Sequence, residues 1–261
     1  MANKEDEAIL PIAVMIGVTG LVGRQLISQL LISGRYREIY AVVRKRFKLD
    51  SIEAASVTQV HWLEIPDFTQ LKNVLVNYDF TNADVFSTLG STQKQAGSKA
   101  AFYQIDHDYN LAFAEITRQQ GARHFLLVSA MGADAKSLIF YNRVKGELES
   151  DIQHVGFEYY SIFRPSLLIG ERKDSRLGEG IAQSMFSWSQ SFLPKTFSAL
   201  PIKAEQVALA MSQISVLKSK SFLQDQVAVS VALQQQSSSK VTASLIPHVD
   251  IYSNKMMLGM S

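Results

Sequence analysis

The 261-residue sequence contains no cysteine. This absence excludes disulfides, thiolate metal sites and a cysteine nucleophile. Charged residues make up only 19% of the chain and the formal net charge is +2, so no concentrated basic face of the kind that binds nucleic acid is indicated. The five histidines show no metal-ligand spacing. We therefore expect neither a nucleic-acid partner nor a metal site.

Long apolar runs are also missing. No stretch approaches the roughly 20 apolar residues that a bilayer-spanning helix needs. The N-terminus carries Lys4, Glu5, Asp6 and Glu7 in place of the basic start and apolar run of a secretory signal. We expect no membrane span, and a cytoplasmic location fits the lack of cysteine.

What the sequence does have is 47% hydrophobic residues, which is enough for one sizeable core. We predict one domain over residues 1–261, with a core over about 11–165 and a C-terminal substrate or lid region over about 166–261. Within the core, apolar runs alternate with stretches of helical periodicity. Such alternation indicates parallel strands joined by right-handed crossovers.

The predicted strands are apolar throughout, as expected when helices cover both faces of a sheet. The fold class is therefore α/β: a Rossmann-type doubly wound parallel sheet with helices on both faces and a small C-terminal extension on the substrate side. The predicted strands are Pro11–Gly17, Glu38–Val43, Val60–Ile65, Ala83–Leu89, His124–Ser129 and Glu158–Arg164. The predicted helices are Leu21–Ser33, Phe68–Val76, Ala101–Gln120, Leu138–Ile152 and Ala204–Ile214. Gly34 and Gly121 are expected to end two of these helices. Beyond residue 214 the pattern indicates only two short strands, Gln226–Leu233 and His248–Tyr252.

A glycine pattern, Gly17, Gly20 and Gly23, follows the first predicted strand and opens the first predicted helix. Gly17 would allow the sharp turn off the strand, Gly20 would let a pyrophosphate approach, and Gly23 would let the helix pack on the sheet. The helix N-terminus would offer N–H groups to phosphate. We predict a dinucleotide-binding loop rather than a plain glycine turn, and its expected contacts also include Thr19, Leu21 and Val22.

The end of the second predicted strand bears on the choice of cofactor. NAD-binding sites usually place an acidic residue there to bind the ribose hydroxyls, whereas this strand is followed by Arg44 and Lys45. Arginine can bind a 2′-phosphate in bidentate fashion. We predict NADP(H) in preference to NAD(H); the alternative is a solvated basic turn.

Tyr141 and Lys145 are spaced by four on a predicted helix, which places them on one face. Ser129 closes the fifth predicted strand, at the sheet edge where ligands of α/β folds bind. Reduction of a carbonyl needs a proton for the developing alkoxide, and a neighbouring ammonium would lower the high pKa of tyrosine toward neutral pH. We predict a catalytic set of Ser129, Tyr141 and Lys145; the alternative is two ordinary residues on a helix surface.

Together these features resemble the short-chain dehydrogenase/reductase superfamily, and most closely its atypical, Tat-interacting-protein-like subfamily of NAD(P)-binding oxidoreductases. The resemblance covers roughly residues 12–210. The segments that carry it are Thr88–Lys94, Tyr103–Tyr109, His124–Ser129, Tyr141–Glu147 and Phe163–Leu168.

The resemblance implies further cofactor contacts around the same sheet edge. Residues after the fourth strand would line the diphosphate and ribose, Asp67 would lie near the adenine, and residues after the sixth strand would lie against the nicotinamide carboxamide. The residues after the fourth strand are Leu89, Gly90 and Ser91. Those after the sixth strand are Pro165, Leu167 and Leu168. Lys145 would also bind the nicotinamide ribose.

One residue departs from the superfamily pattern. Many members place an asparagine in the helix before the fifth strand, where it supports a water-linked proton relay through the lysine. The matching position here is Asp106. We interpret Asp106 as a solvated carboxylate in the first turn of a helix.

Two functions follow as hypotheses. The first is an NADP-dependent enzyme that transfers hydride to or from a small carbonyl or alcohol substrate, with Tyr141 as the acid or base. The alternative is a non-catalytic or weakly catalytic NADP(H)-binding regulator that presents a surface to a protein partner. The resemblance implies that the protein is a monomer or a homodimer. The aromatic residues Phe186, Trp188 and Phe192 could form a substrate lid, pack in the core or face a partner.

Overall fold

The computed structural model describes residues 11–49, 56–170, 200–218 and 248–260. In this part of the chain, seven parallel strands form one sheet in the order β3-β2-β1-β4-β5-β6-β9. The strands are β1 (Ile12–Ile16), β2 (Glu38–Val43), β3 (Gln59–Glu64), β4 (Asp84–Ser87), β5 (His124–Val128), β6 (Tyr159–Arg164) and β9 (His248–Ser253). A separate two-stranded pair joins β7 (Leu168–Ile169) to β8 (Ile202–Lys203). The predicted doubly wound Rossmann-type sheet is confirmed.

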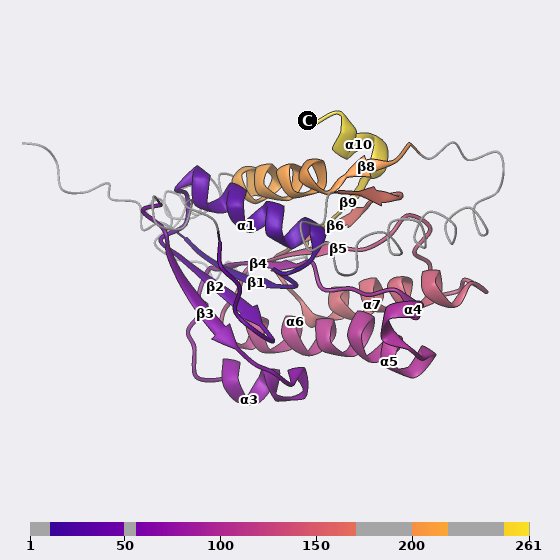
Figure 1. Cartoon of the computed structure of the whole chain (residues 1–261), viewed down its shortest axis with the longest axis horizontal. Helices are drawn as coiled ribbons and strands as arrows, with labels where there is room; N and C mark the ends of the chain where they lie inside the picture. Colours follow the sequence, from indigo (N-terminus) through magenta and orange to yellow (C-terminus); the bar gives the residue numbers. More distant parts are fainter. Residues whose placement is uncertain (1–10, 50–55, 171–199, 219–247, 261) are drawn as a thin grey trace, which may run out of the picture.

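Helices cover both faces of the sheet (Figure 1). One face carries α1 (Leu21–Ser33), the helix of residues 204–218 and α10 (Asn254–Leu258). The other carries α3 (Leu71–Leu75), α5 (Lys99–Tyr103), α6 (Tyr109–Gln119) and α7 (Phe140–Val155). Shorter turns are α4 (Gln93–Ala96), a 3-10 turn (Phe68–Gln70) and a π-helical turn (Gln104–Asp108). In the described residues, no helix is both long and apolar enough to cross a membrane.

The apolar strands supply two cores at once because successive side chains point to opposite faces of a sheet. In β1, Ala13 and Met15 pack with Leu26 of α1, whereas Val14 and Ile16 pack on the opposite face. All of these side chains are fully buried. Burying each large one contributes about 1.5–3 kcal/mol.

The predicted helix ends are confirmed. Gly34 follows α1 with a φ of 58°, and Gly121 lies just beyond α6 with a φ of 91°. Both angles lie in the left-handed region that glycine adopts without steric cost. A glycine after an apolar helical stretch was therefore a sufficient signal for both helix ends.

The predicted helix Ala101–Gln120 is present from Lys99 to Gln119, but it contains a π-helical turn that was not predicted. The segment starts at Lys99 and is divided by the π-helical turn, in which the Tyr109 N–H donates to the Gln104 carbonyl. The Asn110 Nδ2 donates to the Ile105 carbonyl over 3.0 Å, and the Ser87 hydroxyl donates to Asn110. A polar network between β4 and this helix therefore stabilises the wider turn.

The C-terminal region was expected only to extend the substrate side of the fold. It also contributes a strand to the main sheet. Strand β9 pairs in parallel with β6, with His248 opposite Tyr159, so the region completes the sheet. The expected strand Gln226–Leu233 lies outside the described residues. The three aromatic lid candidates at 186, 188 and 192 lie outside them too.

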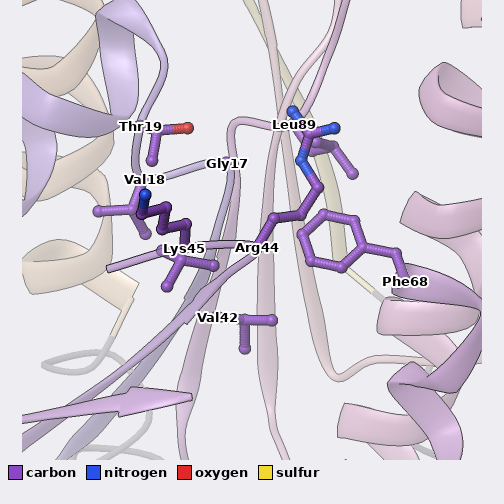
Figure 2. Close-up of a pocket in the computed structure, with 9 residues that line it drawn as sticks. Gly17, Val18, Thr19, Val42, Arg44, Lys45, Phe68 and Leu89 are labelled. Carbon is purple, nitrogen blue, oxygen red and sulfur yellow. The ribbon is translucent and has the colours of Figure 1, made fainter. Parts of the chain in front are cut away.

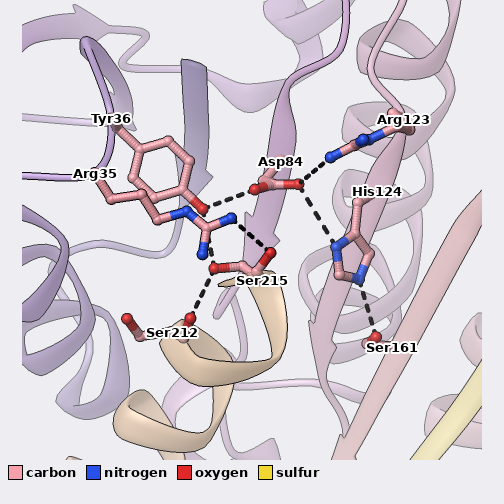
Figure 3. Close-up of polar contacts among 8 residues, drawn as sticks. All are labelled: Arg35, Tyr36, Asp84, Arg123, His124, Ser161, Ser212 and Ser215. Atoms are coloured by element: carbon pink, nitrogen blue, oxygen red, sulfur yellow. Dashed lines mark hydrogen bonds and ion pairs between the residues drawn. The ribbon is translucent and has the colours of Figure 1, made fainter. Parts of the chain in front are cut away.

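A buried polar cluster lies at the amino ends of the central strands (Figure 3). The Tyr36 hydroxyl donates to Asp84 over 2.8 Å and lies 3.0 Å from the Ser215 hydroxyl of the helix of residues 204–218. His124 Nδ1 lies 3.6 Å from Asp84, and its Nε2 lies 2.9 Å from the Ser161 hydroxyl. The cluster connects three strands to a helix at the edge opposite the glycine loop.

Candidate functional site

The glycine loop turns sharply off β1. Gly17 has a φ of +79°, and a Cβ there would lie 2.4 Å from the Leu89 nitrogen. A Cβ on Gly23 would lie 2.3 Å from the Gly17 carbonyl oxygen. Gly20 is the least crowded, with its nearest neighbour, the Gly17 oxygen, at 3.2 Å. Gly17 and Gly23 thus serve the turn and the helix packing, and Gly20 presents open backbone.

The N-terminus of α1 follows this loop. Gly20 is its N-cap, with extended backbone and no side-chain cap. Leu21 is half-buried, and Val22 is 5% exposed and packs in the core. The Val22 side chain therefore cannot reach a ligand, and its backbone N–H is what the site could offer. Free N–H groups and the helix dipole favour an anion at this position.

Arg44 and Lys45 follow β2 and are exposed. Both line a cleft of about 340 Å³ with Gly17 and Phe68. Figure 2 shows their side chains extending from the strand end toward the glycine loop and Leu89. Two cations therefore stand where parallel strands of this fold present residues to a ligand.

The adjoining part of the cleft has a volume of about 500 Å³. It contains Thr19, Asp67, Leu89, Gly90 and Ser91, all five of them expected cofactor contacts. Sequence reasoning missed the remaining lining residues, which are Pro66, Phe68, Thr88, Gln95, Gln104, Ile105 and Tyr109, together with Val18, Val42 and Val43 in the first part.

Asp67 also has a local role that the sequence interpretation missed. Its carboxylate accepts the Thr69 N–H over 2.9 Å and caps the turn that follows. This bond lowers the pKa of Asp67. Phe68 packs edge-on against Tyr109, with ring centroids 5.8 Å apart, so apolar rings wall the cleft beside Asp67. A short Asp-x-Thr spacing was the signal that could have revealed the cap.

Ser129 directly follows β5. Its N–H donates to the Phe163 carbonyl over 2.8 Å, which aligns the end of β5 with β6. Its side chain is 5% exposed, and among the described residues its hydroxyl has no hydrogen-bond partner. A buried hydroxyl without a partner is costly, so its retention is consistent with a ligand oxygen as its partner.

The loop after Ser129 is fastened to α7. The Asp134 N–H donates to the Asn142 carbonyl over 3.0 Å. Gly146 allows still closer contact, because a Cβ there would lie 2.1 Å from the Ala135 nitrogen. The helix that carries Tyr141 and Lys145 is thereby held against the loop that begins at Ser129.

Lys145 is paired with Asp106. Its Nζ lies 2.8 Å from Asp106 Oδ1, with the two side chains 4% and 0% exposed. The interpretation of Asp106 as a solvated carboxylate is wrong, because the π-helical turn places it in the interior. Burial alone would lower the pKa of Lys145, but Asp106, and then Tyr141, outweigh it and raise that pKa.

Tyr141 is half-buried, and its ring packs against Phe102 with centroids 5.6 Å apart. Burial raises the pKa of Tyr141 above 10.0; Lys145 opposes this and Asp106 adds to it. The expected effect of Lys145 is therefore present in direction, but in this structure it is outweighed. Burial and Asp106 therefore both favour the neutral phenol.

The three residues expected after β6 line neither part of the cleft. The Pro165 carbonyl accepts the Met131 N–H, and the Leu167 carbonyl accepts the Ile202 N–H over 3.0 Å. Leu168 belongs to β7 and packs against the core that contains α1. Their visible role is to connect the end of β6 with the Ser129 loop and with β8.

A dinucleotide fits the described residues. The open backbone at Gly20 and the uncapped helix N-terminus suit a diphosphate. A Cβ on Gly90 would lie 3.5 Å from Lys145 Nζ, so Lys145 lies directly behind the cleft wall at Gly90, although none of the three predicted catalytic residues lines the cleft itself.

Comparison with known proteins agrees with this geometry. A family model described as NAD(P)H-binding matches residues 17–184. The chain belongs to this family of NAD(P)-binding, Rossmann-type, short-chain-dehydrogenase-like proteins. It binds a nicotinamide dinucleotide, and its family is of the oxidoreductase type.

Named relatives cover most of the chain. Protein HTATIP2 of Rattus norvegicus is 30% identical over 216 residues, which is 80% of this chain and 86% of that protein. Protein FMP52, mitochondrial, of Candida albicans is 34% identical over 177 residues, which is 67% of this chain and 76% of that protein. These relatives confirm the resemblance to the Tat-interacting-protein-like subfamily.

Solved structures show the same fold at low sequence identity. A short-chain dehydrogenase/reductase family oxidoreductase from Burkholderia thailandensis has a TM-score of 0.53 and 14% identity, covering 95% of this chain and 93% of its own. The UDP-Glc/GlcNAc 4-epimerase from Campylobacter jejuni has a TM-score of 0.55 and 14% identity, covering 77% and 73%. At such identities the likeness concerns the fold alone.

The expected cytoplasmic location is contradicted. Fungal relatives from Candida albicans, Emericella nidulans and Eremothecium gossypii carry the name "mitochondrial". We based the expectation on the absence of cysteine, which is a property of composition and does not determine the subcellular location.

Proposed function

We propose that the protein is an NADP(H)-dependent reductase or dehydrogenase that acts on a small carbonyl or alcohol substrate. The observation that supports this proposal is the attachment of the Ser129 loop to α7 beside a cleft whose wall at Gly90 adjoins Lys145. In the proposed site, this loop supplies a hydroxyl, and this helix supplies a phenol and an ammonium. A cofactor-binding protein without catalysis has no need of such a set.

The preference for NADP(H) rests on Arg44 and Lys45. Both line the cleft directly after β2, where an acidic residue would serve the ribose of NAD. A guanidinium can form two parallel hydrogen bonds with a phosphate, and an ammonium adds a point charge. A 2′-phosphate therefore has two partners here.

In the proposed mechanism, Ser129 donates a hydrogen bond to the carbonyl oxygen of the substrate and orients it. Tyr141 gives its hydroxyl proton to that oxygen, and water returns a proton to Tyr141 afterwards. Lys145 binds the ribose beside Gly90. Bound NADPH supplies the hydride that completes conversion of the carbonyl to an alcohol. General acid catalysis of this kind contributes about 10²–10⁴-fold in rate.

Substitution of Tyr141 tests the proposal. With NADPH and a panel of small aldehydes and ketones, Tyr141→Phe should lower turnover by about 10²-fold or more and leave the dissociation constant of NADPH nearly unchanged. Tyr103→Phe is the matched control, because the Tyr103 ring stacks on His107 and its hydroxyl is hydrogen-bonded to Glu147, which is not part of the proposed site. Turnover in Tyr141→Phe equal to that of the wild type would refute the mechanism and favour a regulatory role.

A further inference from the structure

Asp106 connects the wall of the cleft to Lys145. Its Oδ2 accepts both the backbone N–H of Ser91, over 2.8 Å, and the Ser91 hydroxyl, over 2.6 Å. Its Oδ1 lies 2.8 Å from Lys145 Nζ. Gly90 covers the pair, because a Cβ there would lie 3.2 Å from Asp106 and 3.5 Å from Lys145. Each carboxylate oxygen of this fully buried side chain therefore faces a group of the proposed site.

Stability does not explain such a pair well. Removing two charges from water costs several kcal/mol per ion, and buried pairs are often no more stable than apolar replacements. Asp106 also lies in a π-helical turn, a distortion that is frequent at functional sites. The cost and the distortion both point to a role in the chemistry of Lys145.

Burial is the largest influence on the pKa of Tyr141, and the charges of Lys145 and Asp106 modify it in opposite directions. Three groups raise the pKa of Lys145: Asp106, Tyr141 and, more weakly, Glu149. Glu149 is itself paired with Arg164. For Tyr141, Lys145 favours the phenolate, whereas burial and Asp106 favour the phenol. The carboxylate therefore offsets the ammonium that would otherwise help to ionise Tyr141.

We propose that Asp106 is a positioning residue: by pairing with Lys145 beside Gly90 it offsets the ammonium that would otherwise help to ionise Tyr141, so that the buried Tyr141 stays a phenol and the site suits carbonyl reduction, the direction that needs a proton donor. This inference rests on the proposed role of Tyr141. Reduction needs a proton donor: the O–H bond of Tyr141 breaks as the alcohol O–H forms, and NADPH is oxidised by loss of hydride to the carbonyl carbon. Oxidation would need the phenolate, which Asp106 disfavours.

A titration of Tyr141 tests the inference without substrate or cofactor. The protein is labelled at the tyrosine ring carbons, and the Tyr141 signal is assigned by its loss in Tyr141→Phe. Asp106→Asn should lower the Tyr141 midpoint by about one unit, because a nearby charge shifts a pKa by roughly 1–3 units and Asp106 raises the pKa of Tyr141. Asp108→Asn removes the same charge two residues away, where the carboxylate faces His107 and is half-exposed, and should leave the midpoint unchanged. An unchanged midpoint in folded Asp106→Asn would overturn the inference.

A second variant covers the case in which Asp106→Asn fails to fold because Lys145 is left unpaired. D106N/K145M removes both charges together. If the two charges offset each other, its Tyr141 midpoint stays close to that of the wild type, whereas a midpoint well above it would overturn the inference. The titration does not depend on turnover, so a shifted midpoint in Asp106→Asn with full activity in Tyr141→Phe would refute the proposed function and leave the charge relation intact.

Discussion

At the scale of single residues, substitution of Ser129 should affect turnover and the free energy of unfolding in different ways. Its hydroxyl is buried and has no partner among the described residues. Removing an unsatisfied buried polar group costs little or stabilises, whereas removing one partner of a formed bond costs about 1–3 kcal/mol. Ser129→Ala should therefore keep or raise the free energy of unfolding while turnover falls, as measured by urea unfolding and steady-state kinetics.

Ser87 provides the matched control. It is also buried, but its hydroxyl donates to Asn110. Ser87→Ala should lower the free energy of unfolding by about 1–3 kcal/mol. If Ser129→Ala is destabilised as much as Ser87→Ala, then Ser129 is a structural residue and its catalytic role is in doubt.

At the scale of strands and helices, the polar cluster in Figure 3 makes stability depend on pH. Burial lowers the pKa of His124 below 6.5, with Asp84 opposing and Arg123 adding to the effect. The unfolded chain then binds the proton more readily than the folded chain. The contribution of His124 is complete above pH 6.5 and is lost as the pH falls toward its folded pKa.

We therefore expect the wild type to lose stability as the pH falls below about 6.5. His124→Gln removes the titrating ring and keeps a group that can bond to Ser161, so its stability should vary less over this range. Urea unfolding across the range checks this. Equal losses in both proteins would show that other groups govern the acid response.

Asp84 affects stability at lower pH than His124 does. Burial alone would raise the pKa of Asp84, but His124, Arg123 and Tyr36 hold it below 3.8. Its contribution to stability is therefore lost only as the pH falls below that value.

Elements governed by local signals were predictable from sequence. Apolar periodicity and a terminal glycine defined α1 without error, and β2 was also predicted at its observed bounds. The π-helical turn was not predictable, because it depends on Ser87 and Asn110, which meet only in the folded protein. For the same reason Asp106 was taken for a surface group until its contact with Lys145 was visible.

At the scale of the whole molecule, the strand order builds the cleft. Because β1 lies between β2 and β4, their carboxyl ends bring together the glycine loop, Arg44 and the segment at Gly90, which are far apart in the sequence. The predicted contacts after β2 and β4, and Gly17, Thr19 and Gly20 after β1, line that cleft, whereas Leu21, Val22 and Gly23 do not. The contacts expected after β6 do not line it, because that segment turns instead to pair with β8. The sequence pattern could predict where each strand ends, but not the course of the chain after each strand.

The account depends above all on a dinucleotide cleft that selects NADP(H) through Arg44. Arg46 is the matched control, since its guanidinium lies over Trp62 at 5.4 Å and lines neither part of the cleft. Calorimetric titration of NADPH and NADH into the wild type, Arg44→Ala and Arg46→Ala is the most direct test. We predict that Arg44→Ala weakens NADPH by about tenfold or more, as expected for a lost hydrogen bond to a charged group, with little change for NADH and none in Arg46→Ala. Equal weakening of both cofactors in Arg44→Ala, or none for NADPH, would contradict the account.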